Sequence, residues 1–245
     1  MKSMRAGWRM LRILMHILSG VWIAAFRMPR LSAAEQSAQV QAWALALLGH
    51  AGIRLEILGQ PPVTGPVLLV ANHLSWLDIP VMHAAYHCRF VSKSDIKDWL
   101  LIGNLATAAG TLYIERASRR DALRVVHRMR DALVAKEVLA VFPEGTTGDG
   151  RVLLPFHANL LEAAISADAP VQPVGLRFAD KASGQTSYAP SYVGDDTLVG
   201  SIWRTLSAPP MVAVVHYGKL EKADKRDRRT WSLHLHAAVD RLRKS

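Results

Sequence analysis

The first fifty residues contain a strongly apolar segment with a basic flank on each side. Residues 13–26 (ILMHILSGVWIAAF) are apolar except for His16 and Ser19. As a helix this run is roughly 21 Å long, which is shorter than the ~30 Å hydrocarbon core of a bilayer. A polar stripe follows the segment and its flanks at steps of mostly three or four residues: Arg5, Arg9, Arg12, His16, Ser19 or Gly20, Arg27 and Arg30. The pattern favours a helix that lies in the membrane interface over a simple spanning helix.

A second apolar helix is predicted for residues 35–50, where Val40, Trp43 and Leu47 recur at helical spacing. Residues 1–50 are therefore predicted to form a membrane-associated helical hairpin. A cleaved secretory signal is the alternative, because a basic start and a short apolar run are followed by small residues at 32–34. The two arginines that follow the apolar run argue against that alternative.

From residue 53 the pattern changes to short β-type runs that alternate with helical ones. Helices are predicted from Ser118, over 158–167 and near the C-terminus, where Trp231, Leu235 and Val239 mark one face of a basic amphipathic helix. The segment 183–200 is predicted to be irregular. Strands are predicted at 53–58, 66–71, 89–92, 111–115, 138–142, 171–178 and 211–217. The alternation predicts one α/β domain over residues 51–245, with a mixed, mostly parallel sheet flanked by helices.

The charge distribution adds a candidate partner. The 245 residues carry a formal net charge of +10, and half of them are apolar, which excludes a disordered chain. Residues 1–34 hold six basic and no acidic side chains, and residues 219–245 hold nine basic and four acidic ones. Both segments also contain aliphatic and indole groups, so their charge favours contact with an anionic lipid surface over nucleic acid. The single cysteine, Cys88, excludes an intramolecular disulfide and favours a reducing compartment.

The first candidate for chemistry is the segment Asn72-His73-Leu74-Ser75-Trp76-Leu77-Asp78, which directly follows an apolar strand. Sites in α/β proteins form at such strand ends. A histidine at the start of a helix can turn back so that Asp78 accepts its Nδ1 proton, which leaves Nε2 free to act as a general base toward a hydroxyl. A structural hydrogen-bonded histidine is the alternative reading of the same pair.

Two further strand ends carry polar groups. The run Val141-Phe142-Pro143-Glu144-Gly145-Thr146-Thr147 places a carboxylate, a permissive glycine and two hydroxyls in a loop that can hold a polar ligand. The run Gly110-Thr111-Leu112-Tyr113-Ile114-Glu115-Arg116 delivers an arginine suited to a forked grip on phosphate. A surface ion pair of Arg116 with Glu115 or Asp121 is the alternative.

In their order, N-H-L-S-W-L-D, G-T-L-Y-I-E-R, F-P-E-G-T-T and V-Q-P-V resemble the four sequence blocks of the glycerolipid acyltransferase family, which includes 1-acylglycerol-3-phosphate acyltransferases. The resemblance runs from about residue 53 to about 178. It implies that His73 is the base and Asp78 its orienter. It also implies that residues 8–50 correspond to the family's membrane-docking helices. The implied substrate-binding residues are Arg116 for the acceptor's phosphate, Glu144, Gly145 and Thr146 for the acceptor, and Lys93 near the site.

The expected function is a membrane-associated O-acyltransferase that moves a fatty acyl group from acyl-CoA or acyl carrier protein to a lysolipid hydroxyl. The first expected acceptor is 1-acyl-sn-glycerol-3-phosphate, which gives phosphatidate. Thr147 stands where the phosphatidate-forming members often have arginine, and His157-Ala158-Asn159 replaces a typical Lys-x-Gly. Lyso-ornithine lipid or another lysophospholipid is therefore the alternative acceptor. No cofactor, no metal and no nucleic acid are expected, and the expected location is the cytoplasmic face of the inner membrane, peripheral or monotopic.

Three other classes compete with this interpretation. A serine hydrolase could use Ser75, but the chain has no Gly-x-Ser-x-Gly elbow. A metal hydrolase could recruit His73, Asp78 and Glu144, but no paired histidines at ligand spacing support it. A non-catalytic lipid-surface or nucleic-acid-binding module would explain the basic termini and would leave the three polar strand ends without a purpose.

Overall fold

The computed structural model describes residues 2–114 and 119–245, so Arg116 and the predicted helix start at Ser118 lie outside the described residues. The described chain forms a seven-stranded sheet in the order β1-β7-β6-β2-β5-β3-β4. The pairing of β6 with β7 is antiparallel, and the other neighbours pair in parallel. The strands are β1 (Ile53–Leu58), β2 (Val67–Ala71), β3 (Arg89–Lys93), β4 (Leu112–Ile114), β5 (Val138–Val141), β6 (Val171–Asp180) and β7 (Met211–Tyr217). The predicted α/β class with a mixed, mostly parallel sheet is confirmed.

The parallel strands bring three of the predicted site residues to one edge. Strands β2, β3 and β5 run in the same direction, with Val70 opposite Val141 and Phe90 opposite Ala140. We call the edge where these strands end the carboxyl edge of the sheet. His73 follows β2, Glu144 follows β5 and Lys93 ends β3, so all three lie along this edge.

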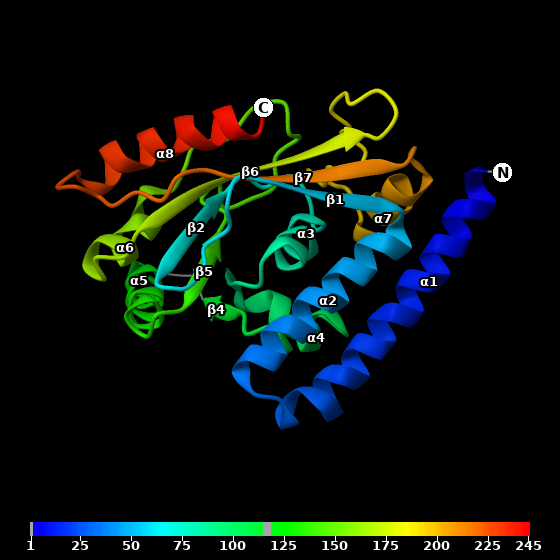
Figure 1. Ribbon diagram of the computed structural model, residues 1–245, viewed down its shortest axis with the longest axis horizontal. Helices are drawn as coiled ribbons and strands as arrows, with labels where there is room; N and C mark the ends of the chain where they lie inside the picture. The colour runs from blue at the N-terminus through cyan, green and yellow to red at the C-terminus, as the bar shows by residue number, and fades with distance from the viewer. Residues whose placement is uncertain (1, 115–118) are drawn as a thin grey trace.

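Helices cover both faces of the sheet, as the alternation of side chains along β2 requires. Leu69 and Ala71 join a core cluster with α2 and α3, whereas Leu68 and Val70 join a second cluster with α5, α6 and α8. Figure 1 shows α8 across the sheet from α2 and α3. The helices are α1 (Lys2–Trp22), α2 (Ala33–Ala51), α3 (Asp78–Ala85), α4 (Ile102–Ala108), α5 (Arg119–Val134), α6 (Glu162–Ser166), α7 (Leu198–Ser207) and α8 (Arg228–Leu242).

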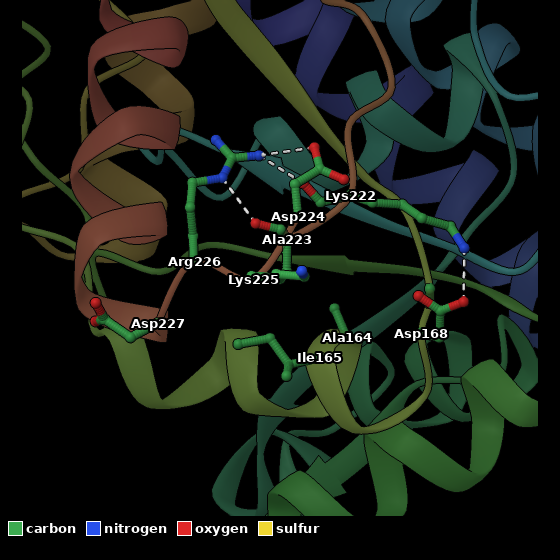
Figure 2. Close-up of a pocket in the computed structure, with 10 residues that line it drawn as sticks. Ala164, Ile165, Asp168, Lys222, Ala223, Asp224, Lys225, Arg226 and Asp227 are labelled. Atoms are coloured by element: carbon green, nitrogen blue, oxygen red, sulfur yellow. Dashed lines mark hydrogen bonds and ion pairs between the residues drawn. The ribbon is translucent and has the colours of Figure 1, made fainter.

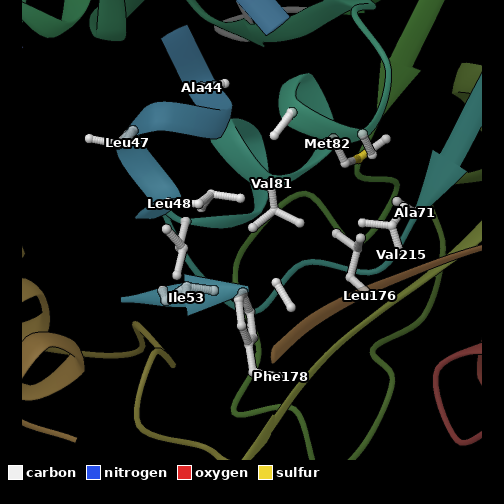
Figure 3. Packing of buried hydrophobic residues seen from close by; sticks show 14 of the residues in the cluster. Ala44, Leu47, Leu48, Ile53, Ala71, Val81, Met82, Leu176, Phe178 and Val215 are labelled. Carbon is white, nitrogen blue, oxygen red and sulfur yellow. The ribbon is translucent and has the colours of Figure 1, made fainter. Parts of the chain in front are cut away.

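The first cluster fixes α3 against the sheet (Figure 3). Leu48 of α2, Val81 of α3 and Phe178 of β6 are almost fully buried. Each such side chain contributes about 1.5–3 kcal/mol by leaving water. Gln41 of α2 also donates from Nε2 to the carbonyl oxygens of Ala84 and Ala85, at the end of α3. The helix that begins at Asp78 therefore has little freedom to move relative to β2.

The N-terminal helix is longer than the apolar run predicts. Helix α1 continues through a π-helical turn at Ile23–Arg27 and a 3₁₀ turn at Met28–Arg30, and α2 follows after a capping box formed by Ser32 and Glu35. Within the described residues, Ser3–Arg30 is the one helix long and apolar enough to cross a membrane by length and composition. The helix thus extends into both basic flanks, as the polar stripe predicts, and whether it spans the bilayer or lies in the interface stays a prediction.

The side of α1 that packs against the protein and the side that is exposed do not follow the predicted polar stripe. Arg9 donates to the carbonyl oxygen of Leu206 on α7, and the His16 ring stacks on Trp43 of α2, so part of the stripe packs against the protein. The opposite side of α1 and its extension exposes large apolar side chains, which we call the outer apolar face: Met4, Trp8, Leu11, Leu14, Met15, Leu18, Trp22 and Phe26. An exposed apolar surface of this extent indicates association with a membrane.

The C-terminal segment does not present a second lipid surface of the predicted kind. Trp231, Leu235 and Val239 of α8 are fully buried in the second core cluster, so the apolar side of this helix packs on the sheet. Helix α4 was not predicted, and the start of α7 lies in the segment that was predicted to be irregular. Both helices are short, and α4 contains Gly103 and Thr107, which are poor helix formers.

Candidate active site

The loop that carries His73 begins where β2 leaves the sheet. Asn72 is buried, and its side chain donates to the carbonyl oxygen of Leu176 at 3.0 Å and accepts from the Leu176 amide at 2.7 Å. These two bonds extend the pairing with β6 by one residue after the backbone ladder has ended. His73 is therefore the first residue beyond a fixed strand end.

Asp78 holds the ring and the backbone of this loop at once. Its Oδ2 lies 2.8 Å from His73 Nδ1 and accepts the amides of Leu74 and Ser75 at 2.6 and 2.8 Å. The carboxylate is fully buried at the first residue of α3, where the helix N-terminus favours negative charge. The predicted contact between Asp78 and His73 Nδ1 is confirmed. His73 Nε2 makes no hydrogen bond in the described part of the chain, which leaves it available to take a proton.

The imidazole plane is fixed by a second contact. The His73 ring stacks on Phe142, with ring centroids 3.9 Å apart and an interplanar angle of 4°. Phe142 directly follows β5, so two adjacent strands determine the orientation of the ring. The side chain of His73 is 17% exposed, which leaves the ring accessible at its edge. Such preorganisation is what a general base requires.

Glu144 braces the histidine loop from the neighbouring strand end. Its Oε1 accepts the His73 amide at 2.7 Å, and its Oε2 accepts the Leu154 amide at 2.9 Å. Burial raises the pKa of this carboxyl, and the two amide hydrogen bonds oppose that shift. Both oxygens are engaged by the protein, so the geometry indicates that Glu144 positions the loop, which the sequence pattern did not predict.

The rest of the Phe-Pro-Glu-Gly-Thr-Thr segment wraps the same loop. Gly145 has φ of 72°, a conformation that favours glycine, and its amide closes a turn onto the carbonyl oxygen of Phe142. The Gly148 amide donates to the carbonyl oxygen of His73 at 2.8 Å. Thr146 is exposed, whereas the Thr147 hydroxyl donates to the carbonyl oxygen of Tyr192. Thr146 is thus the side chain of this segment left open to a ligand.

A residue from the predicted irregular segment completes the loop's hydrogen bonding. The Tyr192 amide donates to the carbonyl oxygen of Leu74 at 2.9 Å. With this bond, the backbone donors and acceptors of His73 and Leu74 all have partners. No signal in the sequence marks Tyr192, because the contact uses only its backbone.

Of the two cationic residues predicted near the site, the structure describes Lys93. Lys93 is exposed at the end of β3, on the same edge as His73, and no hydrogen bond or ion pair joins it to the histidine loop in the described residues. Arg116 follows the end of β4 at Ile114 and lies outside the described residues. Their roles in substrate binding stay predictions.

The structure also bears on the competing chemistries. Ser75 is fully buried, and its hydroxyl accepts the Leu77 amide at 3.1 Å, so it is not presented as an accessible nucleophile. Among the residues that the structure describes, no group of three or more His, Cys, Asp or Glu side chains is arranged to hold a metal ion.

A surface cavity of about 480 Å³ lies away from these residues (Figure 2). It is lined by residues that precede β6 and follow β7, at the edge of the sheet opposite the carboxyl edge. Four of its charged groups form two ion pairs, with Lys222 Nζ 2.6 Å from Asp168 and Arg226 3.7 Å from Asp224. The cavity holds none of the predicted site residues, so it is not the candidate active site.

A cluster of phenylalanine and histidine rings packs against Phe142 and predicts that the fold loses stability at low pH. Phe90 packs on both Phe142 and the buried His83, and burial lowers the pKa of His83 to about 3 and that of the adjacent His87 to about 4. An unfolded histidine binds a proton near pH ~6.5, so between that pH and the folded pKa the unfolded state holds more protons. The contribution of neutral His83 to the free energy of unfolding should therefore be complete above pH ~6.5. Below that pH the free energy of unfolding should fall by roughly 1.4 kcal/mol per pH unit.

Urea unfolding at pH 7 and at pH 5 checks this expectation with His83→Gln. The variant should show a shallower loss of unfolding free energy on acidification than the wild type. His127→Gln, at an exposed position on α5, is the matched control. An equal loss in His83→Gln and wild type would contradict the assignment.

Comparison with known proteins agrees with these features. A family model described as Acyltransferase matches residues 52–177. The 1-acyl-sn-glycerol-3-phosphate acyltransferase of Neisseria gonorrhoeae is 39% identical over 67% of this chain and 64% of the relative. The lyso-ornithine lipid O-acyltransferase of Pseudomonas aeruginosa is 34% identical over 84% of this chain and 81% of the relative. The chain thus aligns with somewhat less than two thirds of the gonococcal protein.

A solved structure is similar over nearly the whole chain. The crystal structure of the 1-acyl-sn-glycerophosphate (LPA) acyltransferase, PlsC, from Thermotoga maritima has a TM-score of 0.64, covering 97% of this chain and 98% of that chain. The sequences are 15% identical, so this likeness is one of fold.

Proposed function

Because the chain belongs to the Acyltransferase family, we propose that it moves a fatty acyl group from an acyl thioester to the free hydroxyl of a lysolipid. The main candidate acceptor is 1-acyl-sn-glycerol-3-phosphate, with phosphatidate as the product, in line with the name of the gonococcal relative. The observation that carries the proposal is the His73–Asp78 pair, which is braced at the carboxyl edge of the sheet.

In the proposed reaction, His73 Nε2 takes the hydroxyl proton as the acceptor oxygen attacks the thioester carbonyl carbon. The Asp78 carboxylate accepts a hydrogen bond from Nδ1–H and stabilises the imidazolium that forms. The carbon–sulfur bond then breaks, and the departing thiolate takes the proton back from the imidazolium. A thiol with a pKa of ~8.5 is a better leaving group than an alkoxide, so the transfer needs no covalent acyl-enzyme. Acyl-CoA and acyl carrier protein both supply such a thioester.

Lyso-ornithine lipid is the second candidate acceptor. The Pseudomonas relative with that activity in its name matches 81% of its own length, a larger share than the gonococcal protein. In addition, Thr147 donates its hydroxyl to the Tyr192 carbonyl oxygen, so this position supplies no cation for a phosphate.

The proposed location is the cytoplasmic face of the inner membrane, where acyl thioesters are available. The outer apolar face of α1 would lie in the lipid interface there and keep the site near an acceptor that stays in the bilayer. A non-catalytic lipid-surface protein would use the same face, but it would have no need for the buried Asp78 carboxylate at His73.

A donor and acceptor panel tests the proposal. Purified protein in detergent is offered acyl-CoA or acyl carrier protein together with lysophosphatidate, other lysophospholipids or lyso-ornithine lipid. We expect an O-acylated product with at least one pair, and the relative kcat/KM values identify the acceptor. Vesicle binding without acyl transfer to any acceptor would favour the non-catalytic protein.

A further inference from the structure

A second apolar projection lies beside the N-terminal helix. After β3 ends at Lys93, a 3₁₀ turn at Ser94–Asp98 leads to Trp99 and Leu100, just before α4. Leu100 is 86% exposed and Trp99 is 42% exposed. Because β3 ends at the carboxyl edge of the sheet, this projection leaves the same edge as His73. We call residues 99–101 the Trp-Leu turn.

The backbone holds the Trp-Leu turn in an uncommon conformation. Leu101 has φ of 66° and ψ of −49°, and the Ile102 amide donates to the Leu100 carbonyl oxygen at 2.8 Å, which makes a γ-turn of the rare form. A Cβ on Gly103 would lie 2.0 Å from the Lys97 carbonyl oxygen, so α4 packs tightly against the start of the projection. A bulky residue with positive φ is energetically costly, and such strain often marks a functional element.

Helix α4 follows the Trp-Leu turn in the chain and packs against α1 (Figure 1). The Leu105 side chain lies 3.0 Å from the place where a Cβ on Gly20 of α1 would sit. Helix α4 also packs against Ile23–Arg27, next to the exposed Trp22 and Phe26 of the outer apolar face. Helix α4 therefore holds the Trp-Leu turn near the end of α1 that carries the exposed Trp22 and, in its extension, Phe26.

We propose that the Trp-Leu turn inserts into the same lipid surface as the outer apolar face of α1 and so seats the carboxyl edge of the sheet against the bilayer. The inference rests on the proposed function for its purpose, since the acceptor hydroxyl must reach His73 from the bilayer. Tryptophan is favoured at the membrane interface, and a leucine beside it gains by leaving water. A bilayer needs no shaped pocket to accommodate two projecting side chains.

The charges around the turn define how insertion should respond to salt. Residues 93–98 contain two lysines and two aspartates, so this segment has no net charge. Insertion of the Trp-Leu turn should therefore be driven by apolar burial and should depend little on ionic strength.

The single native cysteine allows a site-specific test. Cys88 is 1% exposed, and burial raises the pKa of its thiol, so it should not react with a polarity-sensitive thiol dye in the folded protein. The dye is attached to Leu100→Cys, with Trp8→Cys on α1 as the reference for the outer apolar face. Leu233→Cys is the matched control, because Leu233 is 74% exposed on α8, across the sheet from α2 and α3. Unmutated protein reports any labelling of Cys88.

Vesicles of zwitterionic and anionic phospholipid are then added to each labelled protein. We expect blue-shifted, brighter emission from the dye at positions 100 and 8, and no change at 233. A response at 8 without one at 100 overturns the inference and leaves membrane association through α1 intact. A response at 233 equal to that at 100 also overturns it, because binding would not be oriented.

A second variant separates this inference from the proposed function. Leu100→Asp should weaken vesicle binding by about tenfold or more, while acyl transfer to detergent-dispersed acceptor stays at the wild-type rate. Vesicle binding equal to wild type would overturn the inference. Absence of acyl transfer in the wild type itself would instead contradict the proposed function, whatever the dye reports.

Discussion

His73→Ala is expected to lower kcat for acyl transfer by about 10²- to 10⁴-fold, the usual contribution of a positioned general base. The imidazole is the group at the carboxyl edge whose free nitrogen can take the hydroxyl proton, and Asp78 cannot replace it because its carboxylate is buried and engaged. The measurement is single-turnover acyl transfer from the thioester donor that the panel identifies, with binding to lipid vesicles followed in parallel.

Vesicle binding should be unchanged in His73→Ala, because the outer apolar face of α1 does not involve this loop. His127→Ala is the matched control, since His127 is exposed on α5 and should retain full activity. If His73→Ala were about as active as His127→Ala, the role of His73 as general base would be contradicted.

Glu144→Gln is expected to lower kcat by about 10²-fold with little change in KM for the acceptor, because a displacement of the base by about 1 Å has a cost of this size. The glutamate accepts two amide protons, from His73 and Leu154. A glutamine amide can accept one of them, but its NH₂ group then faces the other N–H donor. One buried amide is left without an acceptor, which costs about 1–3 kcal/mol of stability.

The split between kcat and KM decides between two roles for Glu144. A positioning residue affects kcat, whereas a residue that binds the acceptor would raise KM. Glu162→Gln is the control, because Glu162 is an exposed partner of Arg228 on a different part of the fold. A rise in KM with unchanged kcat in Glu144→Gln would show that this carboxylate serves the acceptor and would contradict the positioning role.

Much of the fold follows from local pattern. All seven strands lie where short runs of branched and apolar residues predict them, within about two residues at each end. Two helices were not predicted. Helix α4 is short, contains Gly103 and packs against α1. Helix α7 has an amphipathic pattern and an N-cap at Thr197, but its start falls in the segment that was assigned as irregular. The orientation of α1 was also beyond a pattern argument, since residues on both of its sides are apolar.

The candidate site likewise contains one contact that local sequence predicts and others that depend on the tertiary structure. The His73–Asp78 contact joins residues five positions apart, and a strand end followed by a helix start is enough to predict it. The bond from His73 to Glu144 spans 71 positions, and the contact from Leu74 to Tyr192 uses only backbone atoms. The family resemblance implied that Glu144 helps to bind the acceptor, which stays a prediction. Nothing in the sequence indicates that its carboxylate accepts the amides of His73 and Leu154.

The amino-acid sequence by itself determined the α/β class, the strand positions, the paired His73 and Asp78 and the family resemblance, since each depends on residue types close together in the chain. Only the tertiary structure decided which charged groups are used inside the protein and which apolar faces stay exposed. The parallel strands set distant loops side by side, and packing buried the apolar side of α8 while leaving that of α1 open. Those outcomes depend on which partners meet across the sheet, and no local pattern of residues specifies that.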